Sequence, residues 1–354
     1  MSTPSPLRSA FAERHPDVPL LSLEDPSLTK KTLRDVGWLT PNETVCKIGR
    51  PGEGNMNLTL RVTTDRRSLI VKQSRPWVEK YDVIEAPFDR MLSELAFYEA
   101  VRDLGPVARR MPRLLGAHSD YRLLLLEDLG AGADLSVLYA SQEELAEADA
   151  RSLGEYLRAL HEGTTEVELD NRAMRELNAA HIFDIPLQSD NGVAVEELEP
   201  GLESKAAELR ANSRLAESLG RLKARYLAPG RGSALLQGDF FPGSWLRLAD
   251  GELAVIDPEF AFSGDVEFDV GVAVAHLCMA GQPRAVIDAL VAGRGDSVDF
   301  ELVAGYAGAE VVRRLLGVAQ LPLPPSTGQR ARLLDRAAEA LADGRLDALL
   351  DPAT

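Results

Sequence analysis

The chain has very few cysteine and histidine residues, and their scarcity excludes two common kinds of site. Its 354 residues include 2 cysteines and 5 histidines. Cys46 and Cys278 lie far apart and neither has a CxxC partner, so the sequence predicts no disulfide framework and no zinc site. This cysteine usage suits a reducing compartment, and we expect a cytoplasmic protein.

Long apolar stretches are also missing. The first residues, MSTPSPLRSAFAERHP, lack the apolar segment of a signal peptide. Elsewhere, charged residues such as Glu127 and Arg284 interrupt the apolar runs, so we expect no membrane-spanning segment and no membrane partner. Residues 1–20 are rich in proline, serine and charge, and we expect them to be loosely ordered.

The chain also lacks an excess of basic residues. The formal net charge is −16; residues 1–129 carry 19 Lys and Arg against 18 Asp and Glu, whereas residues 130–354 carry 20 against 37. The second part has a net charge of −17 (20 − 37) and repels nucleic acid, so we expect no nucleic-acid partner. Solubility explains such acidity, and the alternative is an acidic cleft for metal ions or a cationic substrate.

The length and the order of the local patterns predict an α+β protein with two lobes, because one ordinary core would not accommodate the whole chain. In 57–63, Leu58, Leu60 and Val62 alternate with polar residues, which is typical of a half-buried strand. We expect strands at 57–63, 69–73 and 122–126 and helices at 89–103 and 142–161. The lobe boundary is therefore expected near residue 129, with a sheet-containing lobe at 1–129 and a helix-rich lobe at 130–354.

One hairpin in the second lobe brings acidic residues together. Apolar segments at 245–248 and 253–256 flank Asp250-Gly251, which is a strong tight-turn signal. A hairpin returns the chain to the end where it began, so Asp239, before it, is expected to meet Asp257 and Glu259, after it, at one place.

These residues fit the needs of phosphoryl transfer, which are a cradle for phosphates, a cation on them, carboxylates for Mg²⁺ and a carboxylate that orients the attacking hydroxyl. The stretch Gly52-Glu53-Gly54-Asn55 allows backbone N–H groups to approach phosphates, although a plain turn has the same pattern. Lys72 ends an apolar strand, as the phosphate-binding lysine of kinases does, and Glu94 on the next helix is placed to pair with it. A solvent-facing lysine and glutamate are the alternative.

The carboxylates have distinct expected roles. Asp239 is placed to orient a substrate hydroxyl, and Asp257 and Glu259 offer the hard oxygens that Mg²⁺ prefers. Asp269 is expected to cap or brace the loop around Asp239, and His161 to be a packed residue.

The order of the glycine loop, Lys72, Glu94, the lobe junction, Gly238-Asp239 and Asp257 resembles the aminoglycoside phosphotransferase and choline kinase superfamily over most of the chain. Within that superfamily, 257–262 (DPEFAF), 268–271 (FDVG), 54–58 (GNMNL), 70–73 (IVKQ), 127–129 (EDL) and Ser244 resemble methylthioribose kinase.

The resemblance implies a protein-kinase-like fold with a nucleotide-binding N-terminal lobe and a catalytic C-terminal lobe. It implies ATP and Mg²⁺ as cofactors and a small-molecule sugar as substrate, in methionine salvage. ATP would be held by Gly52, Gly54, Asn55, Lys72, Glu94, Glu127, Asp128 and Leu129, Mg²⁺ by Asp257 and Glu259, and the sugar by Asp239 and by Arg313 or Arg314. The oligomeric state is left open, a homodimer being one alternative.

Three departures from the family concern the acceptor. Gln237 stands where the superfamily has histidine, 240–242 (FFP) replaces Leu-His-Thr, and the segment between Glu259 and the arginine pair is shorter. We expect Gln237 to keep the packing and hydrogen-bonding role, and 240–242 to line the acceptor site. The alternatives are therefore an aminoglycoside or amine phosphotransferase, which the acidic second lobe favours, and a non-catalytic ATP-binding regulator.

Overall fold

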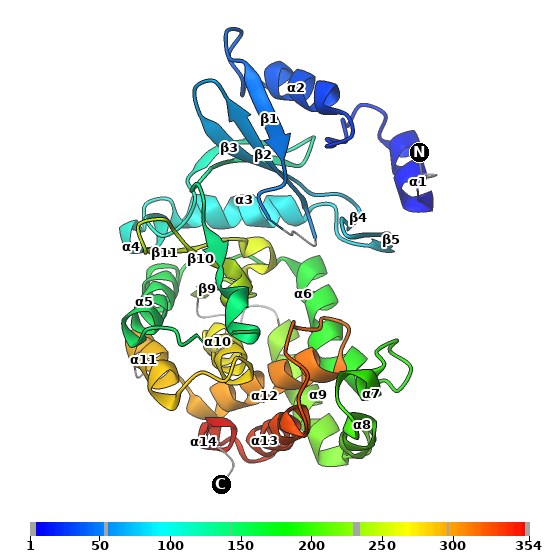
Figure 1. The fold of residues 1–354 in the computed structure, drawn as a ribbon, viewed down its shortest axis with the longest axis vertical. Helices are drawn as coiled ribbons and strands as arrows, with labels where there is room; N and C mark the ends of the chain where they lie inside the picture. The colour runs from blue at the N-terminus through cyan, green and yellow to red at the C-terminus, as the bar shows by residue number, and fades with distance from the viewer. Residues whose placement is uncertain (1–4, 53–55, 142, 229–233, 296, 351–354) are drawn as a thin grey trace.

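The computed structural model describes residues 5–52, 56–141, 143–228, 234–295 and 297–350. A small sheet lies at one end of the molecule and a larger body of helices at the other, with helix α3 (Arg90–Val101) beneath the sheet (Figure 1). This arrangement confirms the predicted α+β fold.

The N-terminal sheet has five antiparallel strands in the order β1-β2-β3-β7-β6. Both of its faces are buried, since Leu69 and Val71 join one apolar cluster with Leu21 and Leu33, while Leu124 and Leu126 join the cluster that continues into the helical part. The strands are β1 (Val45–Gly49), β2 (Leu58–Thr64), β3 (Ser68–Gln73), β6 (Leu114–His118) and β7 (Leu123–Glu127).

The first residues are more ordered than their composition suggests. Residues 1–20 were expected to be loosely ordered, but Pro6–Arg14 forms helix α1, in which Ser5 caps the Arg8 N–H. Phe11 is 5% exposed because its ring packs edge-on against Trp77 and Phe88. A single aromatic residue thus anchors the segment beside β4 (Trp77–Val78) and β5 (Tyr81–Glu85), and helix α2 (Pro26–Asp35) follows it in the chain.

The C-terminal part is helical around one apolar core. Helix α10 is buried on nearly all sides and packs against α12, which fits its almost wholly apolar sequence. The helices are α4 (Gly105–Ala108), α5 (Glu147–Gly163), α6 (Arg172–Ala179), α7 (Val195–Leu198), α8 (Leu202–Arg210), α9 (Ser213–Leu227), α10 (Glu267–Met279), α11 (Arg284–Arg294), α12 (Phe300–Leu316), α13 (Gln329–Asp343) and α14 (Leu346–Leu350).

The predicted hairpin is present as β10 (Trp245–Arg247) and β11 (Leu253–Val255), and the Ile256 N–H donates to the Ser244 carbonyl at its base. This part also holds short strands that the sequence did not predict. The two-residue strand β8 (Ala133–Asp134) extends the hairpin, and β9 (Ala234–Leu236) pairs with β12 (Phe262–Gly264). Strands this short carry no readable period, so the sequence could not reveal them.

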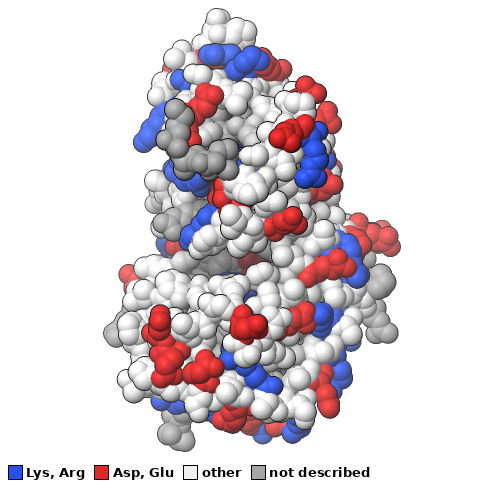
Figure 2. Space-filling model, turned by 90° about the vertical axis from the view of Figure 1, so that its right-hand side faces the viewer, with Lys and Arg blue, Asp and Glu red and all other residues white. Residues whose placement is uncertain are grey.

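Within the described ranges, no helix has both the length and the apolar character needed to cross a bilayer. Figure 2 shows acidic and basic side chains interspersed over one face of the molecule.

Candidate active site

Strand alternation directs Lys72 toward the helical part. In β3, Leu69 and Val71 face the apolar cluster that contains Leu21 and Leu33, so Ile70 and Lys72, on the opposite face, point toward α3. There the Lys72 Nζ lies 2.6 Å from a Glu94 oxygen and 2.9 Å from the Asp257 Oδ1. The expected pairing with Glu94 is thus present, and Asp257 joins it from across the lobe junction.

Burial and the neighbouring charges act in opposite directions on the pKa values of Lys72 and Glu94. Burial alone would lower the pKa of Lys72, but the charges of Asp257 and Glu94 outweigh it and hold that pKa well above its usual value. Burial raises the pKa of Glu94, although Lys72 opposes the rise. The Glu94 Oε2 is buried and has no hydrogen-bond partner among the described residues.

The two candidate metal ligands follow the hairpin. Asp257 has a left-handed backbone (φ 58°) ahead of Pro258, and its side chain is 52% exposed. Glu259 is more enclosed, since its Oε2 accepts from Asn57 at 2.7 Å and lies 3.8 Å from Arg90. Burial raises the pKa of Glu259 to about 7.

The candidate nucleotide-binding residues at the lobe junction use their side chains within the fold. Glu127 pairs with Arg113 at 3.1 Å, and Asp128 binds Arg61 at 2.8 Å and Ser68 at 2.5 Å. Burial favours a higher pKa for Asp128, but these hydrogen bonds and one from the Gly130 N–H lower it below its usual value. A role of residues 127–129 in binding adenine would therefore rest on their backbone groups.

The glycine loop is described only in part. Gly52 is exposed, and no atom of the described residues lies within 4 Å of a Cβ placed on it. Gly54 and Asn55 lie outside the described residues.

The loop that carries Asp239 is braced from α10 by Asp269. The two oxygens of this carboxylate accept the N–H groups of Gln237 at 2.8 Å and Gly238 at 2.9 Å. His161 supports it, because Arg294 donates to the His161 Nδ1 and leaves the Nε2 proton to face Asp269 at 3.1 Å. The expected bracing role of Asp269 and packed role of His161 are confirmed.

Two departures from the family pattern have structural explanations. Gln237 is fully buried, accepts from the Tyr156 hydroxyl at 3.2 Å and donates to the Ile256 carbonyl at 2.9 Å, so it has the packing role expected for it. The expectation that 240–242 lines the acceptor site was wrong for Phe240, which is buried, stacks on Tyr156 and packs at a tilt against Trp245, and for Pro242, which is also buried.

Asp239 faces the arginine pair of α12. Its Oδ1 lies 3.4 Å from the Arg314 Nη2 and 3.8 Å from the Arg313 Nη1. Burial raises the pKa of Asp239, although both arginines oppose the rise. The ring of Phe241 lies 5.1 Å from the Arg314 guanidinium, so this residue does contact the arginine pair.

The three carboxylates do not meet as the sequence suggested. Asp257 and Glu259 are drawn to Lys72, Asn57 and Arg90, whereas Asp239 turns to the arginine pair. Among the residues that the structure describes, no group of three or more His, Cys, Asp and Glu side chains is placed to hold a metal ion. The hairpin closes as predicted, but the three carboxylates bind partners that lie on different elements.

The family model described as "Phosphotransferase enzyme family" matches residues 47–306, which include every group described above except the arginine pair. The chain belongs to this family. The computed structure is similar to a choline kinase from Streptococcus pneumoniae (TM-score 0.55, 14% identity, 90% of this chain and 99% of the other). It is also similar to a choline/ethanolamine kinase family protein from Mesorhizobium loti (TM-score 0.50, 15% identity, 96% and 99%). At such identities the likeness shows the fold alone.

Curated relatives of this family member carry the name methylthioribose kinase. One from Exiguobacterium sibiricum is 28% identical over 66% of this chain and 61% of its own length, and one from Bacillus velezensis is 26% identical over 76% and 78%. Methylthioribose kinase 1 of Oryza sativa is 28% identical over 65% and 55%. The match thus spans about three fifths of the first of these relatives.

Several buried residues of the site escaped sequence reasoning. Asn57 and Arg90 hold Glu259, and Tyr139, His276 and Glu310 stand behind the arginine pair. Only the spacing Glu310-x-x-Arg313-Arg314 gave a local signal, because residues three and four apart share a helix face. The other contacts join elements distant in sequence.

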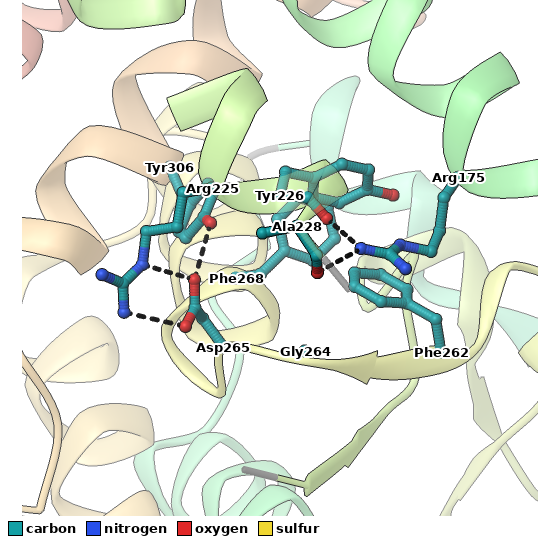
Figure 3. Close-up of a pocket in the computed structure, with 9 residues that line it drawn as sticks. All are labelled: Arg175, Arg225, Tyr226, Ala228, Phe262, Gly264, Asp265, Phe268 and Tyr306. Carbon is teal, nitrogen blue, oxygen red and sulfur yellow. Dashed lines mark hydrogen bonds and ion pairs between the residues drawn. The ribbon is translucent and has the colours of Figure 1, made fainter. Parts of the chain in front are cut away.

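A small hollow that is lined by neither Asp239 nor Lys72, between α6, α9, β12 and α12, encloses only about 10 Å³ (Figure 3). Most of its polar groups are paired, since Asp265 binds Arg225 at 2.6 Å and Tyr306 at 3.0 Å, and Arg175 donates to the Ala228 carbonyl. The Arg175 Nε is buried and has no partner among the described residues. A space of this size holds about one water molecule, so the hollow is structural.

Proposed function

We propose that the protein is an ATP-dependent kinase that transfers the γ-phosphate to a hydroxyl of a 5-modified ribose such as methylthioribose. The observation that carries the proposal is the pairing of Lys72 with both Glu94 and Asp257, together with a separate carboxylate, Asp239, on a braced loop beside two arginines. The names of the curated relatives support the choice of sugar.

In this proposal the chain's own residues bind and orient the reactants. Lys72 contacts the ATP phosphates, and Asp239 accepts the proton of the acceptor hydroxyl as the new P–O bond forms and ADP leaves. Asp257 and Glu259 fit a magnesium ion, because Mg²⁺ takes one or two carboxylates and completes its shell with phosphate oxygens and water. The ion would neutralise charge on the phosphates.

The arginine pair supports a sugar rather than an amine as acceptor. Arg313 and Arg314 bring two positive charges beside Asp239, against the two negative charges of Asp239 and Glu310. A cationic acceptor would gain no net attraction there, whereas sugar hydroxyls can accept guanidinium hydrogen bonds. We therefore propose an uncharged sugar, with use in methionine salvage, in the cytoplasm, where the free thiols of Cys46 and Cys278 are stable.

A coupled assay of ADP release tests this proposal with methylthioribose, 5-deoxyribose, ribose, choline and kanamycin as acceptors. We expect Mg²⁺-dependent turnover on a 5-modified ribose, and a loss of about 10²–10⁴-fold in kcat for Asp239→Asn with Mg-ATP affinity retained. Asp250→Asn, in the exposed hairpin turn, is the matched control and should leave turnover unchanged. Turnover on choline or kanamycin alone would establish the amine alternative, and Mg-ATP binding without turnover on any acceptor would support a regulator.

A further inference from the structure

A directional hydrogen-bond chain runs through the buried interior behind the arginine pair. The Tyr139 hydroxyl lies 2.5 Å from the His276 Nδ1, and the His276 Nε2 lies 3.0 Å from the Glu310 Oε1. All three side chains are at most 3% exposed and come from η1 (Leu135–Tyr139), α10 and α12. Burial lowers the pKa of His276 to about 4, so the ring is neutral near pH 7 and carries one proton.

The chemistry of the end groups fixes the direction of this chain. Burial would raise the pKa of Glu310, but Arg313 and Arg314 hold it well below its usual value, so Glu310 is a carboxylate. It therefore accepts a hydrogen bond from the His276 Nε2–H. The His276 Nδ1 then accepts from the Tyr139 hydroxyl, whose pKa burial raises well above normal. Each group thus has one role, which holds Glu310 in a single position.

Glu310 holds both arginines more closely than Asp239 does. It lies 2.6 Å from the Arg314 Nε and 3.1 Å from the Arg313 Nη1. The corresponding shortest distances to Asp239 are 3.4 and 3.8 Å. Charge-assisted hydrogen bonds to a carboxylate are normally about 2.7–2.9 Å, so neither arginine forms a tight pair with Asp239.

We propose that Glu310, fixed by His276 and Tyr139, is a positioning residue that prevents Arg313 and Arg314 from closing on Asp239. A carboxylate tied into a bidentate pair with a guanidinium has its lone pairs occupied and its basicity reduced. By competing for the arginines, Glu310 leaves Asp239 free for the acceptor hydroxyl. It also leaves donors of the guanidiniums free, including the buried Arg313 Nε, which has no partner among the described residues.

The test compares Glu310→Gln, Glu310→Asp and Tyr139→Phe with the wild type, for both substrates. The inference rests on the proposed kinase function. We expect Glu310→Gln to lower kcat at least about tenfold and to raise KM for the acceptor, since the arginines then close on Asp239, while KM for ATP stays within about twofold. Glu310→Asp keeps the charge and should restore part of kcat, and Tyr139→Phe should cost about two- to tenfold, the value of one hydrogen bond.

Glu199→Gln is the matched control, because Glu199 is 1% exposed and accepts three hydrogen bonds from Ser326, Arg330 and Ala331. It should lower thermal stability without changing the ratio of kcat to either KM. An unchanged kcat in Glu310→Gln, or equal effects of Glu310→Gln and Glu199→Gln on all kinetic constants, would overturn the inference. If Glu310→Gln does not fold, the kinetics of Glu310→Asp and Tyr139→Phe decide it in the same way.

A crystal structure of Glu310→Gln separates this inference from the proposed function. If the wild type phosphorylates none of the sugars, the proposed function fails, but the position of the arginines can still be measured. Shortening of the distance from Arg314 Nη2 to Asp239 Oδ1 from 3.4 Å to below about 3.0 Å supports the inference, and an unchanged distance overturns it.

Discussion

Removal of the Lys72 cation should destabilise the fold through Glu94. In Lys72→Met, Glu94 would be left as a carboxylate that is 1% exposed, with one oxygen already lacking a hydrogen-bond partner among the described residues. Asp257 would lose the same cation, but its side chain is half exposed and can be solvated. The main cost is therefore the buried charge on Glu94, not the loss of two ion pairs.

The magnitude follows from the burial of both partners. Breaking a buried ion pair by removing one member typically costs about 3–5 kcal/mol. In a protein of this size we expect the Tm of Lys72→Met to fall by roughly 5–10 °C. The double variant Lys72→Met/Glu94→Gln removes the uncompensated charge and should recover all but about 1–2 kcal/mol, while Mg-ATP affinity, measured by calorimetry, stays lost in both variants.

The pH dependence provides an internal check. Burial raises the pKa of Glu94 in the folded protein, and loss of Lys72 raises it further, so the folded state retains a proton that the unfolded state releases. The stability of Lys72→Met should therefore rise as the pH falls from 8 toward the unfolded pKa of glutamate. The double variant lacks the Glu94 carboxyl but keeps the raised pKa of Glu259, so its rise should be smaller. A Tm for Lys72→Met equal to that of the wild type, or recovery of ATP binding in the double variant, would refute this account.

Three further predictions concern the loop that carries Asp239. Asp269→Asn should lower the free energy of unfolding by about 1–3 kcal/mol and reduce kcat, because two backbone N–H groups lose their carboxylate acceptor; equal kcat would contradict the bracing role. Gly238→Ala should destabilise more than Gly251→Ala in denaturant titrations: both have positive φ, but a Cβ on Gly238 would lie 2.1 Å from the Phe260 carbonyl oxygen, whereas Gly251 has open space. Gln237→His should change kcat by less than about threefold and leave the acceptor preference intact, since histidine can replace one donor and one acceptor in this buried place; a changed preference would mean that Gln237 reaches the acceptor.

Features with a local signal were predictable from the sequence. The alternation of Leu58, Leu60 and Val62 gave β2, and Asp250-Gly251 gave the hairpin. The pairing of Lys72 with Glu94 also followed, because strand alternation and helix position place both side chains on the same side of the sheet. In each case a short stretch of chain determines the geometry.

Features that depend on packing between distant segments were not predictable. His276 lies 137 residues from Tyr139 and 34 from Glu310, and nothing in the local pattern of α10 distinguishes a bonded histidine from a merely buried one. The order of residues 6–14 depends on Phe11 finding Trp77 and Phe88, which composition alone could not show. The expected meeting of three carboxylates failed for the same reason, since their charged partners come from β3, α3 and α12, which are distant in sequence.

The two groups of carboxylates differ in the freedom that their partners leave them. Asp257 is 52% exposed and shares Lys72 with Glu94, so it can exchange that contact for another cation at little cost in solvation. Asp239 is 19% exposed and faces two guanidiniums that a third carboxylate, Glu310, restrains. In the proposed reaction, Asp257 would exchange Lys72 for Mg²⁺ and Asp239 would accept a proton, and the fold gives them different surroundings by placing Lys72 and the arginine pair on different elements.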